Sequence, residues 1–277
     1  MQSPDEWTRK VATYFDHSSE YWDEVYSDQS VKAQIYRNRM AVIGDWTRAI
    51  GPGAIAAEVG AGAGHFAVLL AQRGIQVAAL DASEAMLTRV AQNASRAGVA
   101  DLVVPLMSDA QKLELPSDTC DLVVAIGLLS WVENPATALA EMVRVAKPGG
   151  YVIVTMDNAT SLVRLLDPGW RLSVRFLIYR IRTRRSRHLA DLPLRLPAPM
   201  TWKKFNGLLH AAGLELIELE GVGFGPFAFL GRSILPNRIG LLIDRALQRV
   251  ADSGRMRLKR AAVFHVALAV KPAAPSA

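Results

Sequence analysis

Cysteine is almost absent from this chain of 277 residues, which contains only Cys120. A single cysteine excludes an internal disulfide framework and any cysteine-rich zinc site, and we predict no metal site. One reduced thiol is consistent with a reducing compartment, so we expect a cytoplasmic location.

Long apolar runs are also missing. The longest, around residues 222–230 and 263–270, are much shorter than the roughly 20 residues that a membrane-spanning helix needs. The first ten residues include Asp5 and Glu6 and lack the apolar stretch of a secretory signal. We therefore expect a soluble protein or one that is peripheral to a membrane.

Acidic residues are scarce in one segment of a chain whose overall net charge is +6. Residues 160–204 contain eleven basic residues and two acidic ones, a net charge of +9. The basic character is therefore a local feature and not a general polyanion-binding surface. The overall content of 51% apolar and 21% charged residues is that of an ordinary globular protein and excludes wholesale disorder.

Short apolar runs alternate with helical stretches from residue 55 onward. The pattern predicts strands over 55–59, 76–80, 102–107, 122–126, 151–156, 214–221 and 262–270, and helices over 65–73, 83–97, 136–145 and 202–212. Such alternation is typical of βαβ units around a parallel sheet. The unbroken apolar run 122–126 predicts a strand buried on both faces.

The sharpest motif is a glycine-rich segment between the first predicted strand and its helix. It contains Gly60, Gly62 and Gly64, and the acidic Glu58 stands two residues before the first of them. Glycines at such a turn let the backbone approach a ligand closely. The G-x-G-x-G spacing differs from the G-x-G-x-x-G of dinucleotide-binding folds. Asp81 ends the second predicted strand, where a carboxylate can accept hydrogen bonds from both hydroxyls of a ribose.

Five motifs in this order resemble those of the class I S-adenosylmethionine (SAM)-dependent methyltransferases. They are Glu58–Gly64, Asp81–Ser83, Ser108–Ala110, Asp121–Val124 and Arg144–Gly150. The resemblance implies an α/β, Rossmann-like fold. Its seven-stranded sheet would be mostly parallel, with an antiparallel last strand, an N-terminal helical lid and C-terminal insertions.

The same resemblance implies a cofactor site for SAM. Its residues would be Glu58, Gly60, Ala61, Gly62, Asp81, Ala82, Asp109, Ala110 and Ile126. Asp81 would hold the ribose, Asp109 the adenine amino group, and Glu58 the amino end of the methionine part.

We divide the chain by composition and motif. The parts are a helical lid over 1–50, a SAM-binding core over 51–157, a basic insertion over 158–200, the rest of the sheet over 201–270 with a second insertion at 223–252, and a loose tail over 271–277. The lid is predicted helical from 7 to 48, and Phe15, Trp22 and Tyr26 fall on one face of that helix. This face can pack on a core or cover a ligand.

Methyl transfer requires positioning of donor and acceptor, and an acceptor that carries a proton can also need a base. Many small-molecule methyltransferases have a histidine after the fourth strand, but residues 128–132 contain none. His17, within the aromatic lid, is the histidine we select as a candidate base.

The predicted function is methyl transfer to a small, apolar or amphipathic acceptor, with O-methylation favoured over N- or C-methylation. The basic stretch 164–187 can cover the pocket or contact an anionic membrane, and we expect no nucleic acid partner. A SAM-binding scaffold or regulator without catalysis and a nicotinamide-dependent oxidoreductase are the alternatives. The oligomeric state stays open.

Overall fold

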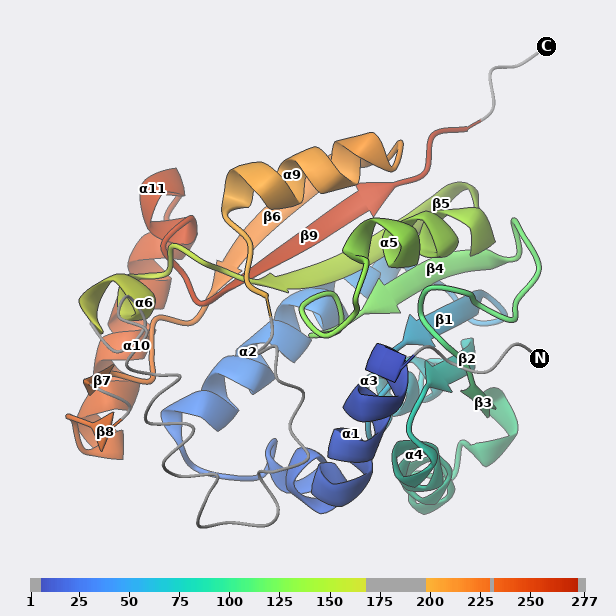
Figure 1. Cartoon of the computed structure of the whole chain (residues 1–277), viewed down its shortest axis with the longest axis horizontal. Coiled ribbons are helices and arrows are strands. Elements are labelled where there is room, and N and C mark those ends of the chain that lie inside the picture. Colours follow the sequence, from blue (N-terminus) through green and yellow to red (C-terminus); the bar gives the residue numbers. More distant parts are fainter. Residues whose placement is uncertain (1–5, 168–197, 230–231, 274–277) are drawn as a thin grey trace.

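A seven-stranded sheet forms the centre of the computed structural model, which describes residues 6–167, 198–229 and 232–273. Its strand order is β3-β2-β1-β4-β5-β9-β6 (Figure 1). The strands are β1 (Ile55–Val59), β2 (Gln76–Asp81), β3 (Val103–Met107), β4 (Cys120–Ala125), β5 (Ala146–Asp157), β6 (Glu215–Val222) and β9 (Phe264–Val270).

The direction of the strands confirms the predicted sheet. β1 to β5 pair in parallel, whereas β9 runs antiparallel to both of its neighbours, β5 and β6. The chain builds outward from β1 to β3 and then returns to place β4 on the other side of β1. Ligands of open α/β sheets bind at such a reversal, beyond the carboxyl ends of the strands.

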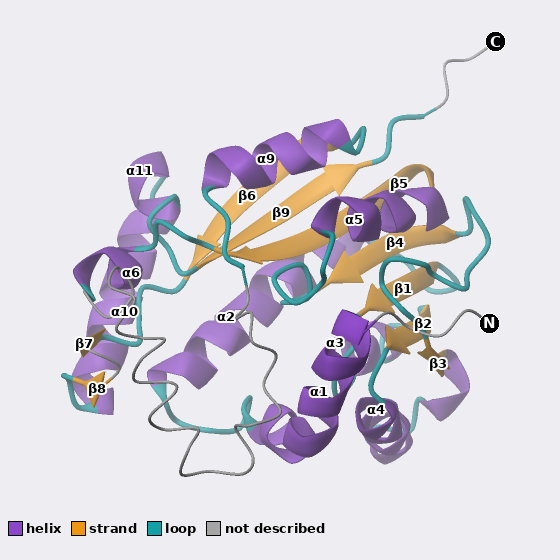
Figure 2. Cartoon of the chain, viewed as in Figure 1, coloured by secondary structure: helices purple, strands orange, loops and turns teal. Residues whose placement is uncertain are grey.

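Helices cover both faces of the sheet (Figure 2), and each face has its own cluster of buried apolar side chains. One cluster joins the sheet to α2 (Val31–Trp46), α3 (His65–Ala71) and α4 (Glu84–Arg96). The other joins it to α5 (Pro135–Val145) and α9 (Trp202–Ala211). Between them, residues 122–125 of β4 have no exposed surface, as expected for a strand packed on both sides.

The N-terminal region contains two helices where one helical stretch was predicted over 7–48. α1 (Glu6–Glu24) and α2 are separated by residues 25–30. The Ser30 hydroxyl accepts the backbone N–H of Ala33 at 3.2 Å and caps α2. The Arg37 guanidinium holds the connection by donating to the carbonyls of Tyr26 (2.6 Å) and Asp28 (2.8 Å). A serine that can cap a helix competes with the continuous helix.

Several short elements complete the described fold. They are two 3-10 turns, η1 (Thr47–Ala49) and η2 (Ala100–Leu102), the helices α6 (Leu162–Leu166), α10 (Asn237–Asp252) and α11 (Met256–Lys259), and the hairpin strands β7 (Ala228–Phe229) and β8 (Arg232–Ser233). The predicted insertion 223–252 contains this hairpin and α10. Most of the basic insertion 158–200 lies outside the described residues. Among the described helices, none is both long and apolar enough to cross a membrane.

Candidate functional site

The glycine-rich loop after β1 has the backbone geometry that only glycine adopts easily. Gly60, Gly62 and Gly64 have φ values of 70°, 54° and 75°, in the left-handed region that disfavours side chains. A Cβ on Gly60 would lie 2.8 Å from Cδ1 of Leu128, so this glycine also permits close packing. A Cβ on Gly62 would meet no atom within 4 Å, so the space beside that residue is open.

Asp81, at the end of β2, holds this loop in place. Its Oδ2 accepts the backbone N–H of Gly62 at 2.9 Å, and its Oδ1 accepts the backbone N–H of Ser83, also at 2.9 Å. Burial raises the pKa of Asp81 despite these hydrogen bonds, because a charged carboxylate loses solvation inside the protein.

Glu58 is the second buried carboxyl group of the loop, and 3% of its surface is exposed. Its Oε2 accepts the backbone N–H of Ala67, in the first turn of α3, at 2.8 Å. Burial raises the pKa of Glu58 to about 8, and the nearby negative charge of Asp81 adds to that rise. A cation placed beside these two carboxyl groups would favour their ionised forms.

The segments after β3 and β4 complete the same site. Asp109 accepts the backbone N–H of Gln111 at Oδ1 (2.9 Å) and the Thr8 hydroxyl of α1 at Oδ2 (3.0 Å). After β4, the backbone N–H of Gly127 donates to the Thr155 hydroxyl of β5 at 2.6 Å.

One cavity gathers all the residues that the sequence predicted to bind SAM. Its lining includes Glu58, Gly60, Ala61, Gly62, Asp81, Ala82, Asp109, Ala110 and Ile126. The cavity extends beneath α1 and α2, and seven aromatic side chains line it: Phe15, Trp22, Tyr26, Tyr36, Phe66, Trp131 and Phe264. It therefore has one half walled by loops and carboxylates and another walled by rings.

α1 is fastened over this cavity by hydrogen bonds to three of the loops. The Trp7 indole N–H donates to the Trp131 carbonyl at 2.7 Å. Asp16 accepts the Ser83 hydroxyl at 2.6 Å and the backbone N–H of Ala85 at 3.2 Å. Thr8 of the same helix reaches Asp109. α1 therefore covers part of the cavity, and its role as a lid stays a prediction.

His17 does not share the position of its aromatic neighbours. It lies on α1 with an exposed side chain and is not among the residues that line the cavity. Phe15, two residues earlier, lines it. The structure therefore offers no geometric support for His17 as the base.

Arg39 of α2 is a site residue that the sequence analysis missed. It is 5% exposed and lines the cavity. Its guanidinium lies 4.9 Å from the ring centre of Tyr36 and 4.8 Å from that of Phe264. Among the described residues, its Nε has no hydrogen-bond partner. A cation buried with an unsatisfied donor is costly unless a ligand completes it.

Asp157, the last residue of β5, is the second site residue that was missed. It lines the cavity at the aromatic half, and its Oδ2 accepts the Ser130 hydroxyl at 2.6 Å. An acid at the carboxyl end of a predicted parallel strand is the signal that could have identified it.

Residues 57–154 match the family model described as a methyltransferase domain. A phosphatidylethanolamine N-methyltransferase of Cereibacter sphaeroides is 35% identical over 97 residues, which are 35% of this chain and 47% of that protein. A ubiquinone biosynthesis O-methyltransferase of Methylococcus capsulatus is 25% identical over 88% of this chain and 96% of its own length.

A third relative, the tRNA 5-carboxymethoxyuridine methyltransferase of Escherichia coli K12, is 33% identical over 38% of this chain and 41% of its own length. The chain thus spans less than half of two of these relatives. Because one of them is a tRNA methyltransferase by name, the predicted exclusion of nucleic acid is not supported.

Solved structures share the fold. Magnesium protoporphyrin IX methyltransferase of Synechocystis PCC 6803, solved with bound S-adenosylhomocysteine (SAH), has a TM-score of 0.64 at 14% identity, over 96% of this chain and 100% of the other. The [4+2]-cyclase SpnF has a TM-score of 0.63 at 18% identity, over 96% and 97%. The sheet order and these neighbours show the Rossmann-like methyltransferase fold, and the domain match over residues 57–154 is consistent with a class I SAM-dependent methyltransferase and supports SAM as its cofactor.

Proposed function

We propose that this chain transfers the methyl group of SAM to a small, apolar or amphipathic acceptor. The observation that carries the proposal is one cavity in which the glycine-rich loop and its carboxylates adjoin seven aromatic side chains. One half suits a polar nucleoside and amino acid, and the other suits an apolar molecule.

The cofactor half fits SAM by the chemistry of its groups. Asp81 accepts hydrogen bonds from the ribose, and Asp109 and the Ala110 N–H bind the adenine. Gly60, Ala61, Gly62 and Ile126 line the methionine end, and Ala82 flanks the adenine. Glu58 lies ionised beside the ammonium group, which offsets its burial.

Arg39 is the partner for the cofactor's carboxylate in this proposal. Among the described residues that line the cavity, it is the one arginine or lysine. Its unsatisfied Nε and its place between aromatic rings suit a carboxylate that approaches from the cavity. A charge-assisted hydrogen bond formed away from water is among the stronger ones in proteins.

Asp157 acts on the acceptor. Bound SAM supplies a methyl group on a good leaving group. Asp157 accepts the hydrogen bond of an acceptor hydroxyl and takes its proton as the oxygen is methylated, while Ser130 fixes the carboxylate. This role favours O-methylation. The Methylococcus relative, which the chain matches along 88% of its length, is an O-methyltransferase by name and supports the same choice.

Transfer of labelled methyl from SAM tests the proposal. The acceptors are a ubiquinol-precursor phenol, phosphatidylethanolamine in detergent, and tRNA, each incubated with wild type, Asp157→Asn and His17→Ala. We expect label in the phenol, a loss of roughly 100-fold or more in turnover for Asp157→Asn with unchanged SAH affinity, and no loss for His17→Ala.

The outcomes separate the alternatives. Label in tRNA alone would reject the small acceptor. If SAM binds but no acceptor is labelled, including in total lipid and metabolite extracts, the chain is a SAM-binding scaffold or regulator and the catalytic proposal is wrong.

A further inference from the structure

α10 exposes large apolar side chains while it buries small and polar ones. Ile239, Leu242, Ile243 and Val250 are 46%, 66%, 36% and 39% exposed. The buried positions of the same helix are Gly240, Asp244 and Ala251. Ile239, Ile243 and Val250 are spaced i, i+4 and i+11 and share one helix face.

The inner face of α10 is held by polar contacts together with the apolar packing of Leu241, Leu247 and Ala251. Asp244 accepts the backbone N–H groups of Phe224 (2.7 Å) and Gly225 (3.2 Å). Gln248 accepts the backbone N–H of Gly223 and donates to the carbonyl of Gly221, both at 2.9 Å. The exposed apolar residues therefore do little to attach the helix, and water contact with them is unfavourable.

Other exposed apolar residues lie at the same end of the molecule. They are Leu165 and Leu166 of α6, Phe229 of β7, Ile234 and Met256. Figure 1 shows α6, α10, α11 and the hairpin together at the left end. The backbone bond from Leu162 N–H to the Ala261 carbonyl, 2.8 Å, joins α6 to the segment after α11. Nine of the sixteen large, exposed apolar residues in the described part of the chain lie here, so they form a patch.

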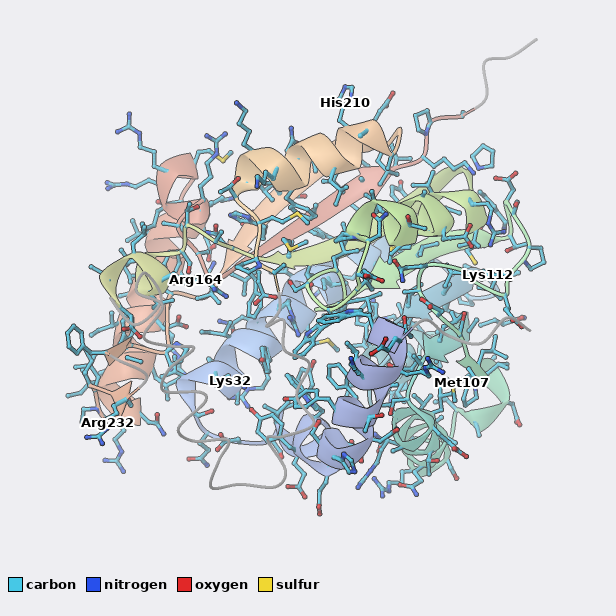
Figure 3. The ribbon with its side chains drawn as sticks, viewed as in Figure 1. Lys32, Met107, Lys112, Arg164, His210 and Arg232 are labelled. Carbon is cyan, nitrogen blue, oxygen red and sulfur yellow. The ribbon has the colours of Figure 1, made fainter. Side chains whose placement is uncertain are left out.

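Positive charge borders this patch. Residues 232–260 contain eight basic and two acidic residues, a net charge of +6 that equals the charge of the whole chain. Arg238, Arg245 and Arg249 are spaced i, i+7 and i+11 and form a stripe beside the apolar face. Within the described residues, none of these three arginines is in an ion pair. Figure 3 shows Arg232 at the outer edge of this end.

We propose that α10 and its neighbours dock on an anionic lipid surface. The α10 surface is defined by Ile239, Leu242, Ile243 and Val250 with Arg238, Arg245 and Arg249. An exposed apolar face flanked by arginines is the pattern of a helix that lies in a membrane interface. The seven residues that define this surface lie outside 164–187, the stretch for which the sequence left membrane contact open, although Leu165 and Leu166 of the wider patch belong to that stretch.

Charge favours lipid over a second copy of the chain. Two copies that paired through the α10 surface would bring two regions of net charge +6 together, which costs free energy. An anionic lipid surface offers both hydrocarbon for the leucine and isoleucines and negative charge for the arginines.

α10 is connected to the active site through α2. The Val31 side chain of α2 packs on α10, since a Cβ on Gly240 would lie 2.9 Å from it. Tyr36 and Arg39 of the same helix α2 line the cavity. A lipid surface bound at α10 would therefore be linked to the cavity through one helix.

Co-sedimentation with vesicles tests the proposal on the full chain. The vesicles are pure phosphatidylcholine, or equal parts of phosphatidylcholine and phosphatidylglycerol. We expect binding to the anionic vesicles only, weakened as salt screens the charges. The double change Arg238→Glu with Arg249→Glu should weaken partitioning by roughly tenfold or more, and Leu242→Ser by about fivefold to tenfold.

A matched control reverses two arginines elsewhere. Arg48→Glu with Arg96→Glu changes the net charge equally but lies outside the α10 surface, and it should bind vesicles nearly as wild type does. SAH affinity and the circular dichroism spectrum, unchanged in every variant, show that the fold is intact and keep this test independent of methyl transfer.

Several results would overturn the proposal. They are no binding to anionic vesicles at low salt, equal binding to neutral vesicles, or variants of the α10 surface that bind as wild type does. A dimer in sedimentation velocity that Leu242→Ser dissociates, without vesicle binding, would assign the surface to a second copy instead.

Discussion

At the residue scale, two carboxyl groups under the glycine-rich loop dominate the site, the buried Glu58 and the partly buried Asp81. Neither Glu58 nor Asp81 has a cationic partner among the described residues, and the pKa of both is raised by burial. The arrangement is costly in the empty protein and becomes favourable with a cationic ligand. Glu58 and Asp81 therefore serve ligand binding more than the stability of the fold.

Glu58 should make the empty protein less stable as pH rises. Its pKa is about 8 when folded and 4.5 as the ordinary value. Because the pKa is raised in the folded state, the contribution of Glu58 to the free energy of unfolding is fully present below pH about 4.5. It is lost as the pH rises to about 8, by an amount on the order of a few kcal/mol. Thermal unfolding across this range should show a smaller decline for Glu58→Gln. An equal decline in wild type and Glu58→Gln would contradict a Glu58 that is buried in its protonated form.

Arg39 should matter for the cofactor and not for the acceptor. Arg39→Met removes the proposed partner of the carboxylate while it keeps much of the apolar stem. We expect SAM affinity to fall by roughly tenfold to 100-fold, measured by calorimetry, with the fold preserved. Arg48→Met, just after the same helix, is the control, because the Arg48 side chain is 75% exposed and pairs with Asp45 outside the cavity. Undiminished SAM affinity in Arg39→Met would reject the assignment.

At the element scale, α1 is the part that we expect to move when ligands enter or leave, since its residues line the cavity together with the loops. It contacts the loops through Trp7 and Asp16, and it contacts α4 through Asp23, which accepts hydrogen bonds from Arg89 and Asn93. Removing one of these contacts should lower the free-energy cost of opening the helix.

Asp16→Ala should loosen this lid. The change removes hydrogen bonds to Ser83 and Ala85, together worth about 1–3 kcal/mol. We expect faster release of SAH in stopped-flow experiments, by roughly tenfold. Glu20→Ala, also on α1 but exposed, serves as the control. If both variants release SAH at the wild-type rate, α1 does not gate the site.

Helices and strands were predictable where one physical signal dominated. The G-x-G-x-G turn and the run 122–126 carry strong local signals, and both appear as expected. The break at residues 25–30 was missed because the Arg37 contacts that hold it come from a later turn of the chain. β5 begins at Ala146, five residues before the predicted start, because Ala146 pairs with Cys120 across an irregularity that the sequence does not reveal.

At the scale of the whole molecule, the strand order explains why distant residues meet. Residues after β1, β2, β3 and β4 reach one edge of the sheet because these strands are parallel neighbours. The sequence alone was therefore enough to place the motifs at strand ends in one site. It was not enough to place Arg39 there, because the burial of Arg39 depends on how α2 packs against Phe264 of the last strand.

The most direct test of the account is calorimetric titration of the purified chain with SAM, with NAD in parallel, for wild type and Asp81→Ala. We predict one SAM per chain and no binding of NAD. Asp81→Ala should lose about 2–4 kcal/mol of binding free energy, because two charge-assisted hydrogen bonds to the ribose disappear. Binding of NAD without SAM, or the same SAM affinity in both proteins, would contradict the central claim.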